Sequence, residues 1–453
     1  MLNKVLISEN SPIKEVMRLI DHSGLRVAYI VDEANKLSGV VSDSEIRKAI
    51  LKGKDIKQPV KDIVNPNPIL LRKNELSDMV AVSERIGKLQ QLMPDSRYIL
   101  VLDNDDRPLK LSMFSELLKK DVENHSVTRS VLVVGGAGYL GSILVRKLLA
   151  KGYGVKVLDV LMFGIEPIED LLENKKFELI KGDMRNISTL VRALADIDAV
   201  INLAAVVGDP ACNKGPETTI ETNYLANKAL AEACKYHQIN RFIYASTCSV
   251  YGQMDGDSEL DENAPLNPVS LYARSKIQSE EGILSLEDEN FSPTILRMST
   301  LYGFSQRMRF DLVVNTMTKN AIIDKTISVH GGGKQWRPLL HVDDAAEAYI
   351  KCLEAPLGKI KGQIFNVGSS KQNYQIIQIG KTVKEHIPTA DLIVEGETMD
   401  VRNYVVSFSK IESLLGFNVG MEIGRSVLRI KDAIINKEVD KLDDPKYYNV
   451  ECY

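Results

Sequence analysis

The segment "VLVVGGAGYLGSILVRKLL" at residues 131–149 decides the fold of most of this chain. Its first apolar residues predict a buried strand, and the apolar pattern after the glycines predicts a helix that begins at that turn. Gly136, Gly138 and Gly141 have the G-x-G-x-x-G spacing, and Gly135 completes a second pattern, G-x-x-G-x-x-G. Glycines permit a tight turn and close backbone approach, so a pyrophosphate can lie on the helix N-terminus. The segment therefore predicts a dinucleotide site.

Apolar runs alternate with helical stretches from this point onward, in "GVKVLDV", "FELIKGD", "DAVINLAA", "RFIYAST" and "SPTILRM". This alternation predicts an α/β domain at 130–304 with a Rossmann-type, doubly wound parallel sheet. The rhythm is lost at 305–437, where we expect a small C-terminal α+β cap that mainly binds substrate. Residues 438–453 look like an extended tail.

Two aspartates end the second and third predicted strands. Asp159 follows Gly138 by 21 residues. A carboxylate there accepts hydrogen bonds from the adenosine ribose hydroxyls and repels a 2′-phosphate, which favours NAD over NADP. Asp183 is placed to accept from the adenine amino group, and a solvated strand end is the alternative for both aspartates.

Tyr272 and Lys276 stand at i and i+4 in "YARSK", so they share one face of a predicted helix. A tyrosine that acts as acid and base near neutral pH needs its phenolate stabilised by about 4 kcal/mol. An ammonium about 4 Å away supplies energy of that order at an effective dielectric constant of about 20. The pattern is common on helices, but here a dinucleotide turn precedes it.

The ordered set of motifs resembles the extended short-chain dehydrogenases/reductases, and more narrowly the NAD-dependent nucleotide-sugar epimerase/dehydratase group. The resemblance covers about 130–437 and is carried by "GGAGYLG", Asp159, Asp183, "NLAA", "ASTCSVYG", "YARSK", "LRMSTLYG" and "RPLLHVDD". It implies that Tyr272 removes a sugar hydroxyl proton while hydride passes to NAD, which gives a transient keto sugar. It also implies that Lys276 lowers the pKa of Tyr272, and that Thr247 bridges Tyr272 and the reacting oxygen.

The same resemblance implies the ligand contacts. The cofactor-binding residues would be Gly135, Gly138, Tyr139, Leu140, Gly141, Asp159, Asp183, Met184, Ala204, Ala205, Asn223 and Lys276. The substrate-binding residues would be Asp209, Cys212, Thr300, Arg337 and Arg402. Arg337 and Arg402 would clamp a nucleotide diphosphate, since guanidinium makes paired, charge-assisted bonds to phosphate. The alternatives are loop-shaping roles for Asp209 and Cys212, and surface ion pairs for the arginines.

Two residues before Tyr251 separate the reaction classes. The family's 4,6-dehydratases usually carry an acid at the position of Ser249, which makes simple dehydration less favoured here. Some relatives that epimerise at C3 and C5 use a cysteine there. Cys248 is one residue away and would face the other side of a strand, so packing is the alternative to an accessory role for Cys248 or Ser249.

The first 122 residues contain an internal repeat. "IVDEANKLSGVVSDSEI" (30–46) aligns without gaps on "VLDNDDRPLKLSMFSEL" (101–117), an offset of 71 residues, and each copy reads as strand, turn, strand, helix. The arrangement resembles a pair of cystathionine-β-synthase (CBS) domains, an α+β tandem module, followed by a linker at 123–129.

The CBS resemblance implies an adenine nucleotide at Ser42 and Glu45. The second copy departs from the pattern, since Lys110 replaces a glycine and Met113 stands where the first copy has Ser42. A structural or dimerising module without a ligand is the alternative.

Composition excludes several classes of protein. The 453 residues carry a net charge of −4 with both signs interspersed, which points away from nucleic-acid and membrane partners. Five cysteines are too few for a disulfide scaffold and lack metal-ligand spacing, so we expect no metal and a cytoplasmic location.

The sequence as a whole favours a nucleotide-sugar epimerase. A C4 oxidoreductase is the alternative, a 4,6-dehydratase is less favoured, and a nucleotide-sensing or structural protein is the non-enzyme reading. Relatives of the catalytic domain and pairs of CBS domains both commonly self-associate. The resemblance therefore implies a homo-oligomer, either a dimer or a tetramer.

Overall fold

The computed structural model describes residues 2–93, 96–117, 128–253, 259–396 and 402–452. The chain divides into two compact units, one formed mainly by Met1–Val127 and the other mainly by Thr128–Cys234 and Ile239–Tyr453. The linker expected at 123–129 lies outside the described residues except for its last two positions.

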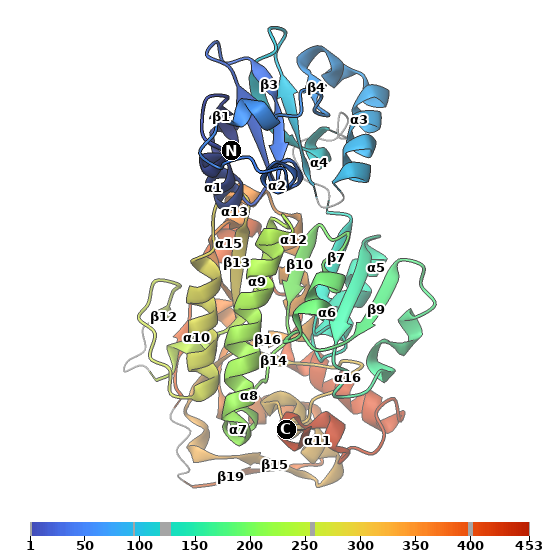
Figure 1. The fold of residues 1–453 in the computed structure, drawn as a ribbon. Helices are drawn as coiled ribbons and strands as arrows, with labels where there is room; N and C mark the ends of the chain where they lie inside the picture. The colour runs from blue at the N-terminus through green and yellow to red at the C-terminus, as the bar shows by residue number, and fades with distance from the viewer. Residues whose placement is uncertain (1, 94–95, 118–127, 254–258, 397–401, 453) are drawn as a thin grey trace. The chain divides into compact units, whose positions relative to one another are not determined.

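The first unit is built from two sheets with the same pairing (Figure 1). In each sheet a parallel pair is followed by an antiparallel pair, and the antiparallel register shifts between Ile30 and Val31 in one copy and between Val101 and Leu102 in the other. The strands are β1 (Leu6–Ser8), β2 (Val27–Val31), β3 (Leu37–Ser42), β4 (Leu71–Arg72), β5 (Tyr98–Leu102) and β6 (Pro108–Met113).

The turns of the two copies also match. Asp32 and Asp103 each accept two backbone N–H groups through Oδ1, at 2.8–2.9 Å. Asn35 and Asp106 each adopt a left-handed backbone, with φ of 60° and 63°. Every one of these pairs is 71 residues apart, so the repeat in the sequence is a repeat in the structure.

One apolar cluster joins the two copies, since it contains Tyr29 and Leu100 from the two central strands. Each copy also has a cluster of its own, around Ile30 and Val101 respectively. The helices are α1 (Ile13–Ser23), α2 (Asp43–Leu51), α3 (Met79–Leu92) and α4 (Phe114–Leu117), with 3-10 turns η1 (Leu2–Lys4), η2 (Val60–Ile63) and η3 (Lys73–Ser77).

The second unit contains a seven-stranded parallel sheet in the order β17-β13-β11-β10-β7-β8-β9. Along β7, Val131 and Val133 enter one apolar cluster, whereas Leu132 and Val134 enter the other. Both faces are therefore buried, as in a doubly wound sheet. The strands are β7 (Ser130–Val134), β8 (Gly154–Asp159), β9 (Phe177–Lys181), β10 (Ala199–Asn202), β11 (Arg241–Thr247), β13 (Ser292–Met298) and β17 (Ile364–Val367).

Helices cover the two faces of this sheet (Figure 1). The face of Val131 packs against α5 (Gly141–Ala150) and α12 (Val342–Glu354). The opposite face packs against α6 (Ile187–Ala193), α9 (Asn227–Tyr236) and α10 (Leu271–Leu284). Connecting elements are η4 (Glu166–Leu171), α7 (Asp209–Lys214), α8 (Pro216–Ile220), the π-helical turn η5 (Glu221–Ala226), η6 (Cys248–Tyr251) and α13 (Leu357–Ile360).

The cap has its own apolar cluster, which includes Val314, Ile379 and Val427. The expected range 305–437 also contains α12 and β17, which return to the main sheet. The cap elements are β12 (Glu259–Leu260), β14 (Thr300–Tyr302), α11 (Val313–Ile323), β15 (Thr326–Val329), η7 (Gly331–Gly333), β16 (Trp336–His341), η8 (Ser370–Gln372), β18 (Asn373–Gln375), α14 (Ile376–His386), β19 (Asp391–Val394), β20 (Val405–Val406), α15 (Ser409–Leu415) and α16 (Ile423–Ile435).

The C-terminal segment is folded, so the expectation of an extended tail is wrong. It forms 3-10 turns η9 (Pro445–Tyr447) and η10 (Asn449–Cys452). Val439 and Tyr447 are buried in a cluster with Phe310, whose ring meets that of Tyr447 edge-on at 5.7 Å between centroids. This apolar anchor fixes a segment whose composition alone looks loop-like.

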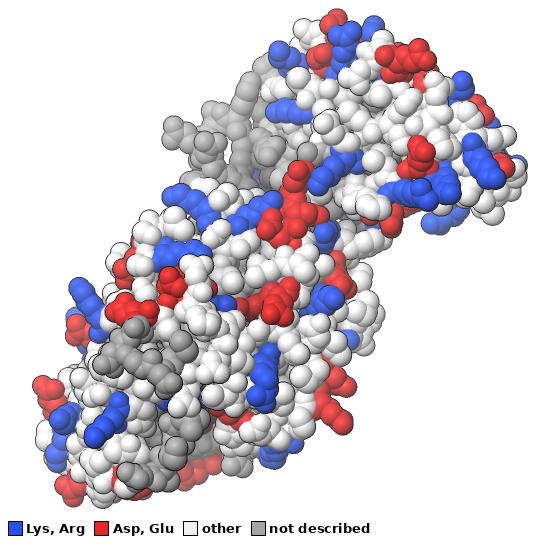
Figure 2. All heavy atoms as spheres, turned by 90° about the vertical axis from the view of Figure 1, so that its left-hand side faces the viewer, with Lys and Arg blue, Asp and Glu red and all other residues white. Residues whose placement is uncertain are grey.

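Acidic and basic side chains are interspersed on the face that Figure 2 shows. Within the described ranges, none of the helices is both long and apolar enough to pass through a bilayer.

Candidate active site

A cavity of about 990 Å³ lies in the second unit where the parallel strands end. Its wall includes the glycine turn after β7, the ends of β8, β9, β10 and β11, and residues of the cap. The carboxyl ends of the strands are where open α/β sheets bind ligands.

The glycine turn has the close approach that its sequence predicts. Gly135 has a φ of 83°, and a Cβ there would lie 2.9 Å from the backbone nitrogen of Ala204. A Cβ on Gly141 would lie 2.3 Å from the carbonyl oxygen of Gly135. Gly138, Tyr139 and Leu140 complete this part of the cavity wall, and α5 begins at Gly141.

Asp159 lies beside this turn and lines the cavity. Its Oδ2 accepts from Ala137 N–H at 2.9 Å and its Oδ1 from Leu161 N–H at 2.8 Å. Burial raises the pKa of Asp159, and these two bonds oppose the rise. Asp183 also lines the cavity, where the Arg185 side chain bonds its carboxylate and lowers its pKa.

The remaining expected cofactor residues separate into two groups. Met184, Ala204 and Ala205 line the cavity. Asn223 lies behind the wall, where it accepts from Val206 N–H at 2.8 Å and donates to Val206 O at 2.9 Å. Asn223 therefore fixes the loop after β10, a role that differs from the direct cofactor contact that the sequence suggests.

Thr247, Tyr272 and Lys276 come together at the cavity wall. Ser270 caps α10 by accepting from Ala273 N–H at 3.2 Å, which places Tyr272 in the first turn and Lys276 one turn later. The Thr247 side chain lies beside Tyr272 and acts to lower its pKa. The Lys276 ammonium donates to Ala245 O at 2.7 Å and lies 5.9 Å from the centroid of the Tyr272 ring.

Burial shifts both titratable groups toward their neutral forms. It raises the pKa of Tyr272 above its ordinary value, and Arg309 is the cation that most opposes this rise. It lowers the pKa of Lys276 to about 8. Arg309 therefore adds a cation toward Tyr272 that the sequence does not mark, beside Lys276, whose Nζ lies near the Tyr272 ring.

The small residues around this group face different ways. Ser249 and Thr300 line the cavity. Cys248 points into the core, where its Sγ donates to Arg297 O at 3.2 Å. Cys212 is also buried and donates to Val206 O at 3.4 Å, in a small apolar cluster against Tyr272. Of the two roles left open for Cys212, the structure favours the loop-shaping one, because its loop turns the thiol inward.

The two arginines expected at the diphosphate both line the cavity, as does Asp209. Arg402 Nη1 lies 3.3 Å from Asp209 Oδ2, and Arg337 donates to the carbonyl oxygens of Trp336 and Arg402. The cap and the loop after β10 therefore meet at a charged contact.

A second group of wall residues was not predicted from the sequence. Arg307, Arg309 and Asp311 come from the loop after β14, and Asn449 and Val450 come from the C-terminal segment. The spacing of basic and acidic residues in "RMRFD" is a usable signal for the first three. Nothing local marks Asn449, because its contacts are distant in sequence.

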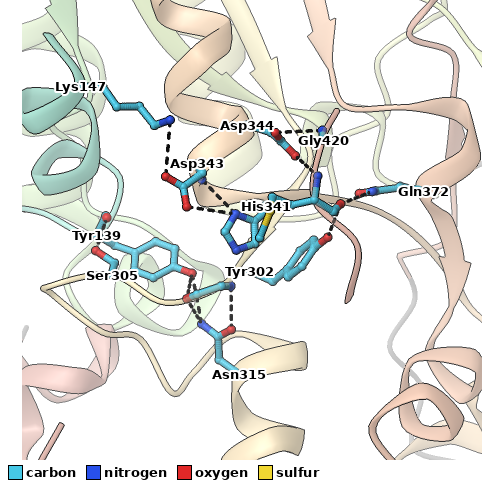
Figure 3. A network of polar contacts seen from close by, with 12 residues as sticks. Tyr139, Lys147, Tyr302, Ser305, Asn315, His341, Asp343, Asp344, Gln372 and Gly420 are labelled. Carbon is cyan, nitrogen blue, oxygen red and sulfur yellow. Dashed lines mark hydrogen bonds and ion pairs between the residues drawn. The ribbon is translucent and has the colours of Figure 1, made fainter. Parts of the chain in front are cut away.

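A buried polar network ties the loop after β14 to the glycine turn (Figure 3). Tyr139 donates its hydroxyl to Gly303 O at 2.7 Å, and Ser305 donates to Tyr139 O at 2.6 Å. Asn315 donates to the Tyr139 hydroxyl at 3.2 Å and accepts from Gly303 N–H at 2.9 Å. The side chain of Tyr139 therefore serves this junction.

The same network continues to the base of the cap (Figure 3). His341 meets Tyr302 edge-on, with 5.3 Å between ring centroids. Asp344 accepts from the backbone N–H groups of Gly420 and Met421, both at 3.0 Å. The loop that carries Arg307 thus follows Tyr302, whose side chain contacts His341 and donates to Met421 O at 3.2 Å.

The wall residues fit NAD. The glycine turn leaves room for a pyrophosphate, Asp159 presents a carboxylate for ribose hydroxyls, and the far end meets Tyr272. Within the described ranges, no group of three or more His, Cys, Asp or Glu side chains is arranged to hold a metal ion.

In the first unit, Ser42 and Glu45 form a capping box at the start of α2. Glu45 accepts from Ser42 N–H at 3.0 Å and contacts its hydroxyl, while Ser42 accepts from Ser44 N–H. Both side chains thus stabilise the helix start, and an adenine nucleotide there stays a prediction.

Known proteins match both units. The family described as "NAD dependent epimerase/dehydratase family" matches residues 131–368, and the CBS domain matches residues 1–52. The chain is 30% identical to "Uncharacterized UDP-glucose epimerase YtcB" of Bacillus subtilis, over 53% of this chain and 77% of that protein. It is 28% identical to a dTDP-glucose 4,6-dehydratase of Xanthomonas campestris, over 63% of this chain and 87% of that protein.

Among solved structures, the UDP-glucuronic acid 4-epimerase of Bacillus cereus matches with a TM-score of 0.61 and 27% identity. The match covers 68% of this chain and 99% of that one. The family match spans more than half of the sequence, includes the glycine turn, and contains Thr247, Tyr272 and Lys276. The chain therefore belongs to the NAD-dependent epimerase/dehydratase family and carries a CBS domain at its N-terminus.

Proposed function

We propose that this protein is an NAD-dependent epimerase of a nucleoside-diphosphate sugar that acts through a transient keto sugar. The observation that carries the proposal is the group of Thr247, Tyr272 and Lys276 at one end of the NAD-fitting cavity. The chemistry that bound NAD supplies is reversible hydride acceptance.

The side chains then have distinct tasks. Tyr272 exchanges a proton with a sugar hydroxyl, and Thr247, which lies beside Tyr272 on the cavity wall, orients that hydroxyl. Lys276 supplies positive charge near the phenolate. Arg337 and Arg402 hold the diphosphate of the sugar nucleotide, since paired N–H donors suit phosphate oxygens.

The two acids that the loops after β10 and β14 bring to the cavity argue against dehydration. Asp209 is paired with Arg402, and Asp311 with Arg309. Burial acts to raise the pKa of Asp311, but Arg309 and hydrogen bonds outweigh it and hold that pKa below its ordinary value. A carboxylate held ionised in this way is a poor proton donor to a leaving hydroxyl. A C4 oxidoreductase would use the same three catalytic residues.

The test is mass spectrometry of products after incubation with NAD and a panel of nucleotide sugars in heavy water. An isomer without deuterium supports C4 epimerisation, and carbon-bound deuterium supports epimerisation at C3 or C5. Loss of two hydrogens indicates net oxidation. A product lighter by one water would overturn the proposal in favour of a dehydratase.

We further propose that the CBS module binds an adenine nucleotide near Ser42 and Glu45 and adjusts turnover, and that the protein works as a homo-oligomer. Titration with millimolar ATP and AMP tests the first point. Unchanged kinetics and an unchanged melting temperature would refute it, and light scattering gives the oligomeric state.

A further inference from the structure

The structure assigns a diphosphate-binding role to Arg307 and makes Asn449, in the C-terminal segment, the residue that positions it. This inference rests on the proposed function, because it requires that the cavity binds NAD and a sugar nucleotide. It goes beyond that function by adding a binding residue and a segment outside the family match, which ends at residue 368.

Arg307 is a buried cation on the cavity wall, only 3% exposed. Its guanidinium lies 3.6 Å from the centroid of the Phe163 ring. Phe163 also lines the cavity and follows Asp159 in the loop after β8. The stacking holds the guanidinium plane at the cofactor side of the cavity. A planar fork of N–H donors held in this way is suited to phosphate oxygens.

Asn449 connects Arg307 to two parts of the wall. Its Oδ1 accepts from Arg307 Nη2 at 2.7 Å, and its Nδ2 donates to Val207 O at 3.3 Å. Its backbone N–H donates to Asp311 Oδ2 at 3.3 Å. One buried amide therefore links the loop after β14 to the loop after β10.

The C-terminal segment is anchored on both sides of Asn449. Phe310 N–H donates to Tyr447 O at 3.0 Å, and the Lys319 ammonium donates to the Tyr448 hydroxyl at 3.0 Å. The Lys214 ammonium donates to Val450 O at 3.1 Å. These contacts hold Asn449 in place, so its bond to Arg307 restricts that side chain.

The local charge favours an anion. Arg309 binds Asp311 through two hydrogen bonds of 2.9 and 2.8 Å. The two arginines carry +2 and the aspartate −1, so the loop presents a net charge of +1 to the cavity. A diphosphate is the anionic group that NAD and a sugar nucleotide share.

Binding of four probes to the full-length protein tests the inference by calorimetry. The probes are NAD, UDP and dTDP, which carry a diphosphate, and adenosine, which does not. Arg307→Gln and Asn449→Ala are compared with wild type and with Asn436→Ala, a matched control at an exposed position outside the cavity wall. A charge-assisted bond is worth about 1.5–3 kcal/mol, so loss of Arg307 should weaken a diphosphate probe at least about tenfold.

We expect both cavity variants to lose affinity for a diphosphate probe while keeping adenosine affinity within twofold of wild type. A loss confined to NAD assigns Arg307 to the cofactor, and a loss confined to UDP or dTDP assigns it to the sugar nucleotide. Unchanged affinities, or equal losses for adenosine and NAD, would overturn the inference. If wild type binds none of the diphosphate probes, the proposed function itself fails.

Discussion

Glu280 and Arg297 form a buried ion pair beside the catalytic group. Breaking this pair gives a quantitative test of what a buried ion pair contributes to the stability of the protein. Glu280 lies one helical turn after Lys276, and its carboxylate contacts the hydroxyl of Ser246, the neighbour of Thr247. Arg297 binds the same carboxylate, with Nη2 at 2.7 Å and Nε at 3.1 Å from its oxygens. The change we consider is Glu280→Gln.

The expected loss of stability follows from the burial of this pair. Both side chains are only 4% exposed, and removing one partner of a buried pair costs about 3–5 kcal/mol because the other charge is left uncompensated. Glutamine has nearly the same volume, so no cavity is added. We therefore expect the free energy of unfolding to fall by about 3 kcal/mol.

The chain offers a matched control in Arg429 and Glu438. Their oxygen–nitrogen contacts are 2.6 and 3.1 Å, but the side chains are 41% and 42% exposed. An exposed pair is worth less than about 1 kcal/mol, so Glu438→Gln should have a small effect. Geometry is similar in the two pairs, and the comparison isolates desolvation.

Urea titration followed by tryptophan fluorescence measures both variants, because Trp336 is the one tryptophan and lies in the second unit. The slope of the free energy against urea should stay constant, since the buried area is unchanged. If Glu280→Gln and Glu438→Gln lose the same stability, the reasoning from burial is refuted.

Tyr272→Phe should lower kcat by about 10²–10⁴-fold and leave the melting temperature unchanged. Product formation measures the first effect and thermal unfolding the second. Activity near that of wild type would exclude Tyr272 as the proton carrier. Lys276→Met should abolish activity and yet stabilise the ligand-free protein by up to about 3 kcal/mol below pH 8. The reason is that burial lowers the pKa of Lys276 from 10.5 to about 8, so its charged form costs stability in the folded protein. Urea titrations at several pH values should show this gain fading as pH rises from 8 toward 10.5. Gly303→Ala should destabilise the second unit by at least about 2 kcal/mol in the urea titration. The reason is that Gly303 has a φ of 115° and a Cβ there would lie 2.4 Å from His341 Nε2. An unchanged urea midpoint would contradict this.

The features that sequence predicts well are those with a local pattern. The alternating faces of β7 follow from an apolar run, and the glycine spacing fixes the turn before α5. Thr247, Tyr272 and Lys276 each belong to a short motif, and the motifs meet because parallel strands end at one edge. The repeat of the first unit is visible because both copies preserve the aspartate that closes the turn.

Contacts between distant segments had no such signal. Asn449 reaches Arg307 over 142 residues and Val207 over 242 residues. Two roles stayed open for Cys212, because the composition of a loop does not say which side of the chain a thiol takes. The C-terminal segment looked extended because its few apolar side chains become an anchor only once Phe310 is beside them.

The pKa values of Lys276 and Tyr272 set the direction in which kcat changes with pH. A tyrosine acting alone as a base would become more active as pH rises toward its pKa. Here Lys276 has a pKa of about 8, so its ammonium is lost before Tyr272, whose pKa burial raises, can ionise. Without the Lys276 ammonium, the phenolate form of Tyr272 is less stable. We expect this loss to outweigh the gain in phenolate that a higher pH would otherwise give. We therefore expect kcat to fall above about pH 8, and a kcat that rises steadily to pH 10 would show that Lys276 does not stabilise the reacting form of Tyr272.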